Sequence, residues 1–157
     1  MAKEEGIGKN TIFSVQVWLN NTVKRMQSNL AQSKSNNTGT LRQSLGRNLQ
    51  EPVKVKGGVL SGAIEATDYW EFVDQGRRPG KQPPLRDILK WVQTKLPRTS
   101  NDMATAFLIA RKIREKGTKG NEFASKVLTT KRIDDLEKSI TNSMREDIII
   151  AINGQIK

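Results

Sequence analysis

Residues 11–33 read TIFSVQVWLNNTVKRMQSNLAQS, and this stretch decides how the chain folds. Its apolar side chains recur at intervals of three and four residues, which places them along one face of a helix. They are Ile12, Val15, Leu19, Val23, Met26 and Leu30. We therefore predict a long amphipathic helix over residues 11–33, capped at Asn10 or Thr11, with one face available to a core. Trp18 lies at the edge of that face, either as a core residue or as an anchor for a partner.

The C-terminal stretch repeats the same pattern. Residues 129–152 read TTKRIDDLEKSITNSMREDIIIAI, with acidic side chains near the start, where a helix dipole favours them. The apolar members of the stripe are Ile133, Leu136, Ile140, Met144, Ile148 and Ile152. The spacing predicts a second long helix, which either docks on the rest of the chain or is used on a neighbour.

Between the long helices, the pattern first changes to alternation. LRQSL, residues 41–45, is a short alternating run, and PVKVKGGVLSGAIEAT, residues 52–67, alternates Val53 and Val55 with lysines before Gly57-Gly58. Alternation around a Gly-Gly turn predicts a hairpin with one wet face. The glycines do not form a phosphate loop, because the G-x-x-x-x-G-K-[ST] arrangement is missing.

Two further helices are expected in the middle of the chain. Pro84 suits the first turn of a helix that must end before Pro97. A second helix begins at Ser100 or Asp102 and stops at Gly117. Its apolar residues on one face are Met103, Ala106, Phe107, Ala110 and Ile113. No secondary structure is assigned to residues 118–130.

These elements predict one α+β domain over residues 1–157, in which three or four helices flank a small, mainly antiparallel sheet. Residues 1–10 are expected to form a flexible or partner-bound arm. The start, MAKEEGIGKN, lacks the apolar core of a signal peptide, and no apolar run approaches the roughly 20 residues of a membrane span. We expect no contact with a membrane and a chain that is soluble where it is made.

Composition removes several kinds of chemistry. The chain has neither Cys nor His, which excludes disulfides, Cys/His zinc sites, and Ser-His or Cys-His nucleophiles. We therefore expect no catalytic residues, no metal and no cofactor. The 27 Lys and Arg outnumber the 16 Asp and Glu, for a net charge of +11. The charge is +5 in residues 1–50, +3 in 51–100 and +3 in 101–157, which indicates a spread surplus without a detachable basic tail. Such a surplus attracts acidic proteins or DNA.

One segment combines aromatic and basic side chains. DYWEFVDQG, residues 68–76, is followed at once by RRPGKQPP, residues 77–84, a stiff and exposed loop. Aromatic residues and Arg contribute disproportionately to binding energy at protein interfaces. The predicted partner-binding residues are Tyr69, Trp70, Phe72, Arg77, Arg78 and Lys81.

Two rival functions remain open. Asp68, Glu71 and Asp74 lie close together in sequence and would suit a divalent metal in a nuclease, although acidic residues on a wet helical face are ordinary. Alternatively, the charge and the helices suit a sequence-nonspecific DNA-binding protein of phage or bacterial origin. Neither a helix-turn-helix pair nor a clustered run of cations supports a sequence-reading regulator.

Short motifs follow one another in order along about two-thirds of the chain. After the leading helix, Thr38, Gly39, Leu41 and Ser44 form a T-G-x-L-x-x-S segment. Tyr69, Phe72, Val73, Asp74 and Gly76 form a Y-x-x-F/Y-V-[ED]-x-G piece, and Pro83 and Pro84 follow in a proline-rich loop. A later match comprises Trp91, Ala106, Ile109, Ala110, Ile113, Gly117, Gly120 and Phe123. In these motifs the chain resembles the minor tail-component or tail-completion family of tailed bacteriophages, in which a strand separates the first two motifs and F-G-T is commoner than Gln75-Gly76-Arg77.

The resemblance implies a non-enzymatic virion protein that assembles in the bacterial cytoplasm. It implies an α+β subunit of a homo-oligomeric ring in the neck, where the head meets the tail. The expected partners are further copies of the chain, a portal-side connector and a tail protein. If genomic DNA passes through the ring, basic side chains in the lumen would contact phosphate without reading sequence.

Overall fold

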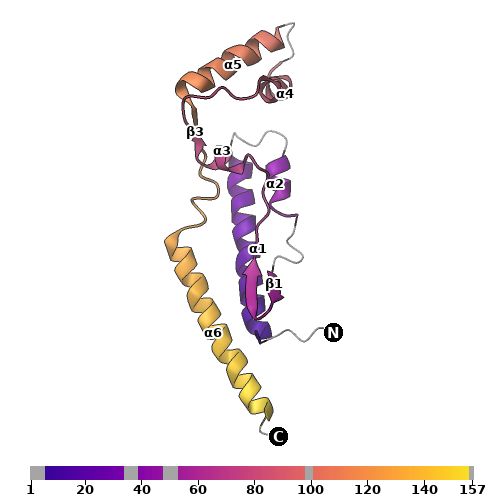
Figure 1. Ribbon diagram of the computed structural model, residues 1–157, viewed down its shortest axis with the longest axis vertical. Coiled ribbons are helices and arrows are strands. Elements are labelled where there is room, and N and C mark those ends of the chain that lie inside the picture. The colour runs from indigo at the N-terminus through magenta and orange to yellow at the C-terminus, as the bar shows by residue number, and fades with distance from the viewer. Residues whose placement is uncertain (1–5, 34–38, 48–52, 98–100, 156–157) are drawn as a thin grey trace.

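Two long antiparallel helices form the backbone of the molecule. The computed structural model describes residues 6–33, 39–47, 53–97 and 101–155. Helix α1 (Lys9–Gln32) and helix α6 (Thr130–Gln155) lie along each other in the lower part of Figure 1. Both predicted terminal helices are therefore confirmed. Because α1 begins at Lys9, the end of the predicted N-terminal arm is helical, and residues 1–5 lie outside the described part of the chain.

Shorter elements connect the two helices. In chain order they are α2 (Thr40–Ser44), β1 (Val53–Lys56), β2 (Val59–Gly62), α3 (Trp70–Asp74), β3 (Gly76–Arg77), α4 (Leu85–Lys95), α5 (Asp102–Lys116) and β4 (Thr118–Lys119). The strands pair antiparallel as β1–β2 and β3–β4, so the predicted α+β class is confirmed. The strands form two separate pairs and not one sheet. The described residues hold six helices, more than the three or four predicted, and the two additional ones, α2 and α3, have only five residues each.

The hairpin forms where it was predicted, but the segment before it does not alternate as a strand. Lys56 pairs with Val59 across Gly57 and Gly58, whose positive φ angles of 57° and 74° suit a tight two-residue turn. The alternation at residues 41–45 does not produce a strand, because this segment forms α2. Leu41 and Leu45 are four residues apart, which also suits a helix, and both are buried against the core.

The core lies between the C-terminal half of α1, helix α2 and a turn at residues 123–128. The buried cluster comprises Val23, Met26, Leu30, Leu41, Leu45, Phe123, Ala124 and Val127. The predicted apolar face of α1 is confirmed, since its members from Val15 to Leu30 are all buried. The turn supplies three of the eight core residues without being a helix or strand, so periodicity could not reveal its role.

Polar contacts hold α6 against α1. The Trp18 indole Nε1 donates a hydrogen bond of 3.2 Å to the Arg132 carbonyl, and the Arg132 guanidinium lies 5.4 Å from the Trp18 ring centroid. Arg132 also donates to the Thr22 hydroxyl at 2.8 Å. Trp18 is thus half-buried in this contact between the helices and is not a free anchor.

A side chain from α6 caps the beginning of α1. The Asp147 carboxylate accepts hydrogen bonds from the Asn10 and Thr11 backbone N–H groups, at 3.1 and 2.9 Å, and from the Thr11 hydroxyl at 2.7 Å. The predicted caps, Asn10 and Thr11, are instead the capped residues, and the N-cap position belongs to Gly8. A Cβ atom at Gly8 would lie 2.0 Å from the Asp147 Cγ, so glycine permits the approach. The negative charge also suits the positive end of the helix dipole.

This cap should give the chain an acid-sensitive contact between its two long helices. Partial burial raises the pKa of Asp147, but the hydrogen bonds from Thr11 and Asn10 outweigh it, and the pKa is below its ordinary value. The stabilisation is therefore complete above about pH 4 and is lost as pH falls through the lower folded-state pKa. We expect Asp147→Asn to lower the free energy of unfolding at pH 7, with the difference from wild type disappearing towards pH 2. Urea denaturation at pH 7, 4 and 2 measures it, and a difference that grows on acidification would contradict the assignment.

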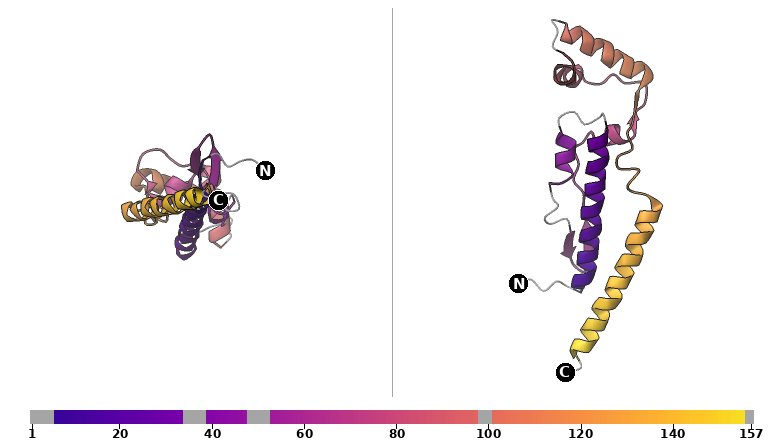
Figure 2. Two further views of the ribbon diagram at one scale, coloured as in Figure 1. Left: turned by 90° about the horizontal axis from the view of Figure 1, so that it is seen from below. Right: turned by 180° about the vertical axis from the view of Figure 1, so that it is seen from behind.

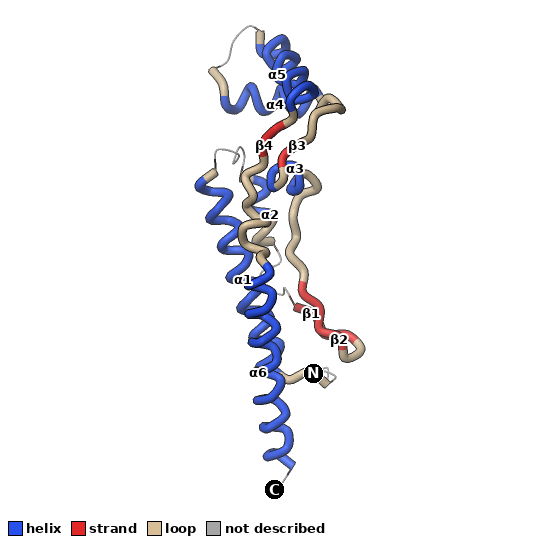
Figure 3. Tube along the Cα trace, turned by 90° about the vertical axis from the view of Figure 1, so that its left-hand side faces the viewer, coloured by secondary structure: helices blue, strands red, loops and turns tan. Residues whose placement is uncertain are grey.

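The molecule is long and thin, with a helical hairpin held away from the body. The chain exposes 11689 Å² of surface. A compact monomer of 17.6 kDa would expose about 7,900 Å². Helices α4 and α5 pack on each other around Val92, Ala106 and Ala110, and reach the body through the β3–β4 pair (Figures 1 and 3). We call the described residues 77–97 and 101–119 the arm. At the other end, α6 extends past the start of α1 (Figure 2).

Candidate interaction site

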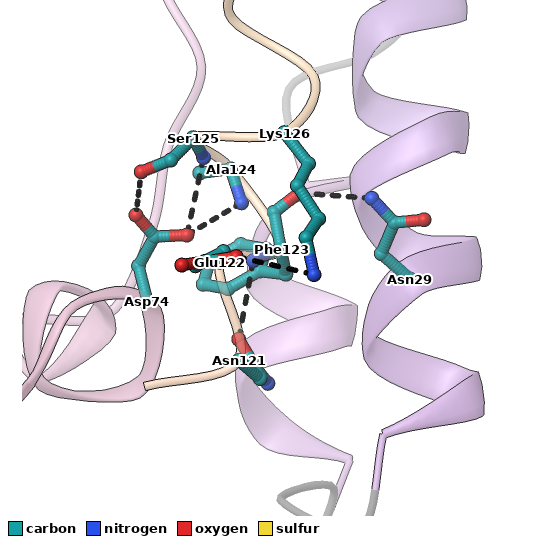
Figure 4. A network of polar contacts seen from close by, with 8 residues as sticks. All are labelled: Asn29, Asp74, Asn121, Glu122, Phe123, Ala124, Ser125 and Lys126. Atoms are coloured by element: carbon teal, nitrogen blue, oxygen red, sulfur yellow. Dashed lines mark hydrogen bonds and ion pairs between the residues drawn. The ribbon is translucent and has the colours of Figure 1, made fainter. Parts of the chain in front are cut away.

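The base of the arm is fixed by one buried carboxylate. Asp74, at the end of α3, is 1% exposed. One carboxylate oxygen accepts hydrogen bonds from the Ala124 and Ser125 backbone N–H groups, at 2.7 and 3.2 Å, and the other accepts from the Ser125 hydroxyl (Figure 4). Asp74 thereby ties α3 to the turn that carries Phe123 into the core.

Glycines let the two strands of the arm's base approach closely. A Cβ atom at Gly120 would lie 2.1 Å from the Asp74 carbonyl oxygen, and one at Gly76 would lie 2.2 Å from the Thr118 carbonyl oxygen. Gly76 also has a φ of 82°, which residues with a side chain rarely adopt. At Gly117, an added Cβ would lie 2.1 Å from the Arg77 carbonyl oxygen. No larger residue fits these three positions without moving backbone.

The acidic residues considered for a metal do not share a site. Asp68 and Glu71 are exposed, whereas the Asp74 carboxylate is buried and turned to donors of the 123–125 turn. Across the described ranges, no group of three acidic side chains has the geometry to hold a metal ion. The role of Asp74 in this structure is to accept hydrogen bonds that fix the backbone.

Basic side chains from two distant segments meet at the base of the arm. Arg77 pairs with Thr118 across β3 and β4, and the Gly80 N–H donates to the Arg114 carbonyl at 2.8 Å. These contacts bring residues 77–81 beside residues 111–119. The cations of the two segments, which we call the basic collar, are Arg77, Arg78, Lys81, Arg111, Lys112, Arg114, Lys116 and Lys119. All are exposed except Arg77, which is partly buried.

The positive charge of the chain is concentrated on the arm. Residues 77–119 contain twelve Lys and Arg against three Asp and Glu, whereas the rest of the chain contains fifteen against thirteen. The prediction of an evenly spread surplus is therefore wrong. The prediction counted charge in windows of about 50 residues, and the boundary at residue 100 divided the arm between two windows. In each window, the charge of half the arm was combined with that of residues outside it, which have little net positive charge. The signal was present in the sequence, but only the structure defines the segment over which to count.

The six predicted partner-binding residues fall in different environments. Trp70 is partly buried and packs against the core, while Tyr69 and Phe72 are 43% and 53% exposed. The Arg77 guanidinium lies 5.2 Å from the Phe72 ring centroid, in a cation–π arrangement. Phe72, Arg77, Arg78 and Lys81 line one shallow hollow, together with Glu71. The structure thus brings four of the six predicted residues together. It also places the Lys and Arg side chains of residues 111–119 in the same region, and the sequence analysis did not identify these.

An apolar groove opens beside the N-terminal end of α3. It has a volume of about 970 Å³ and lies between Met26 of α1, the C-terminal end of α2, the segment leading into α3 and the 123–128 turn. Met26, Leu45, Ile64, Trp70 and Phe123 contribute to its lining. The groove exposes one edge of the main core, and nothing in the described residues fills it.

Further apolar surfaces lie on α6 and α5, towards opposite ends of the molecule. On α6, four of the six residues of the predicted stripe face solvent, since Ile133, Met144, Ile148 and Ile152 are 47%, 49%, 57% and 54% exposed. We call these four residues the outer face of α6. On α5, the predicted apolar face is only partly covered. Ala106 and Ala110 are buried against α4, but Met103 and Phe107 point outward with Leu108 and form the tip patch.

The comparisons leave the family open. No protein-family model matches the sequence, and neither a curated protein nor a solved structure matches it. Among the helices of the described residues, none combines the length and the apolar character needed to cross a membrane.

Proposed function

We propose that the chain is a non-enzymatic structural subunit of a tailed-bacteriophage neck, where it assembles with copies of itself into a ring that joins the head-side connector to the tail. The outer face of α6 is the observation that carries this proposal. A soluble chain rarely leaves a row of large apolar side chains open along a helix unless a partner covers them. Ile133, Met144, Ile148 and Ile152 form such a row on the face that α1 leaves open.

The position of the two apolar surfaces supports a ring in particular. A ring subunit repeats one heterologous contact, so it needs two different patches. The outer face of α6 and the tip patch of α5 differ in composition and lie at opposite ends of the long axis (Figure 1). An arm that rests on a neighbour would also explain how a hairpin with a core of one valine and two alanines stays folded.

The residues that carry the family resemblance provide separate support. Asp74 and Gly76 lie about 45 positions before Gly120 and Phe123, yet they meet at the base of the arm. Asp74 accepts the backbone bonds of the turn, Gly76 and Gly120 permit close backbone contact, and Phe123 fills the core. The members of the pattern thus make one structural unit, and this is what supports the proposal here.

The experiment that tests the proposal combines particle composition with mass. Light scattering of the purified chain is expected to give one discrete multiple of the subunit mass, with closed rings visible by electron microscopy. Mass spectrometry of purified particles should find the chain at a fixed copy number, and particles made without it should contain unjoined heads and tails. A monomer at all concentrations, absent from assembled particles, would refute the proposal.

A further inference from the structure

The basic collar is a dense group of positively charged side chains. Residues 77–81 and 111–119 hold eight Lys and Arg and one acidic residue, Glu115. Arg111 pairs with Glu115 at 2.9 Å, and this hydrogen bond lowers the pKa of Glu115, so that carboxylate is already used. Glu71 lines the hollow beside Arg77, Arg78 and Lys81, but two carboxylates do not neutralise eight cations. The collar therefore keeps a net positive charge, which attracts polyanions.

The local fold keeps these like charges together. Arg114 and Lys116 lie in the last turn of α5, where the negative end of the helix dipole favours cations. The Gly80 N–H bond to the Arg114 carbonyl and the β3–β4 pairing fix the two segments side by side. The cation–π contact with Phe72 holds Arg77 at the collar. The collar is thus a fixed feature of the fold.

We propose that the basic collar binds the phosphate backbone of nucleic acid without reading its sequence. The inference goes beyond the proposed function and does not depend on it, because a single chain already carries the complete collar. Lys and Arg contacts to phosphate supply affinity and position, whereas sequence is read by contacts to base edges. Four of the collar's cations lie on α5, and the other four lie on or beside the β3–β4 pair at the base of the arm.

The distribution of apolar residues favours nucleic acid over an acidic protein. A protein interface has an apolar centre surrounded by polar residues. On α5 the large exposed apolar side chains, Met103, Phe107 and Leu108, all lie in the first half of the helix, and the cations all lie in the second half. The tip patch therefore suits a protein, and the collar suits a line of phosphates. The cations of α5 lie within residues 111–116, about 9 Å of helix, which matches about three phosphates of one DNA strand.

A salt titration with matched charge variants tests the proposal. The probe is a fluorescein-labelled duplex of 24 base pairs, in two unrelated sequences, titrated with the full chain between 50 and 200 mM KCl. The test variant is Lys112→Gln/Arg114→Gln/Lys116→Gln, at exposed positions away from the hollow that contains Glu71. The control, Lys54→Gln/Lys56→Gln/Lys138→Gln, removes the same charge from exposed positions on the body.

Wild type is expected to bind both sequences with equal affinity. Removing three phosphate contacts should make the slope of log K against log salt less steep by about 2.7. Between 50 and 200 mM salt, the fold-loss of affinity of the variant should therefore be about 40 times smaller than that of wild type. The control should keep the wild-type slope.

Four outcomes would overturn the proposal. They are no binding at 50 mM salt, equal losses in the two variants, a tenfold preference for one sequence, and tighter binding of a polyglutamate peptide than of DNA at the same ionic strength. The last outcome would assign the collar to an acidic protein surface. Light scattering of each variant before the titration separates this test from that of the proposed function, since DNA binding can fail while the assembly persists.

Discussion

Replacing Asp74 with alanine is expected to lower the free energy of unfolding by about 3 kcal/mol or more. The carboxylate is 1% exposed and accepts three hydrogen bonds, two of them from backbone N–H groups of the 123–125 turn. Without it, the buried Ala124 N–H is left with no acceptor, at a cost of about 1–3 kcal/mol, and the part-buried Ser125 N–H and hydroxyl also lose their acceptor. The turn that carries Phe123 into the core should then detach from α3. Urea denaturation followed by circular dichroism measures the loss.

The matched control comes from the same short segment. Asp68→Ala and Glu71→Ala remove exposed carboxylates and should change stability by no more than about 0.5 kcal/mol. Asp74→Asn keeps the shape and one acceptor oxygen, so it should fall between wild type and Asp74→Ala. If Asp74→Ala is as stable as Asp68→Ala, the hydrogen bonds of Asp74 to the 123–125 turn do not stabilise the fold. The rival metal site predicts something different, namely that Mg²⁺ stabilises wild type and that all three alanine variants lose this effect.

Placing lysines on the outer face of α6 is expected to dissociate the assembly. Ile148 and Ile152 are more than half exposed in the single chain, so Ile148→Lys/Ile152→Lys should not reduce the stability of the subunit. In an assembled ring they would be buried against a neighbour. Losing two buried isoleucines removes about 4 kcal/mol, which corresponds to about 1,000-fold weaker association. Light scattering across a concentration series should show the monomer where wild type is multimeric.

A variant with the same added charge elsewhere on the helix controls for repulsion. Asn142→Lys/Asn153→Lys adds two lysines to α6 at exposed positions that do not belong to the apolar stripe. It should assemble like wild type. Equal dissociation of both variants would mean that net charge, and not the outer face, governs association. Assembly of Ile148→Lys/Ile152→Lys with wild-type affinity would exclude this face from the contact.

The periodic signals in the sequence were sufficient for the long elements. The apolar intervals in residues 11–33 and 129–152 identified α1 and α6 because a helix of more than 20 residues repeats its pattern many times. Gly57-Gly58 located the hairpin because few other residues accept its turn. Short elements failed for the converse reason. LRQSL holds too few residues to distinguish alternation from a helical turn, and the structure makes it α2.

Periodicity also cannot say which apolar face is covered. The stripes of α5 and α6 were recognised, but Met103, Phe107, Ile148 and Ile152 face solvent in the single chain. An apolar stripe indicates only that one face of the helix packs against something. Whether that is another part of the same chain or a second molecule depends on where the helices lie, and α1 is too narrow to cover the whole stripe of α6.

Local pattern and composition were enough to predict the class of the fold, the two long helices, the hairpin and the lack of cysteine and histidine chemistry. The other features depend on contacts that exist only in the folded chain. Asp74, a candidate metal ligand in the sequence, is a buried acceptor for the 123–125 turn, Asp147 caps α1, and residues 77–81 and 111–119 together form the basic collar. These are contacts between residues about 30 to 140 positions apart, and no local pattern records which distant donor or charge the folded chain will bring alongside.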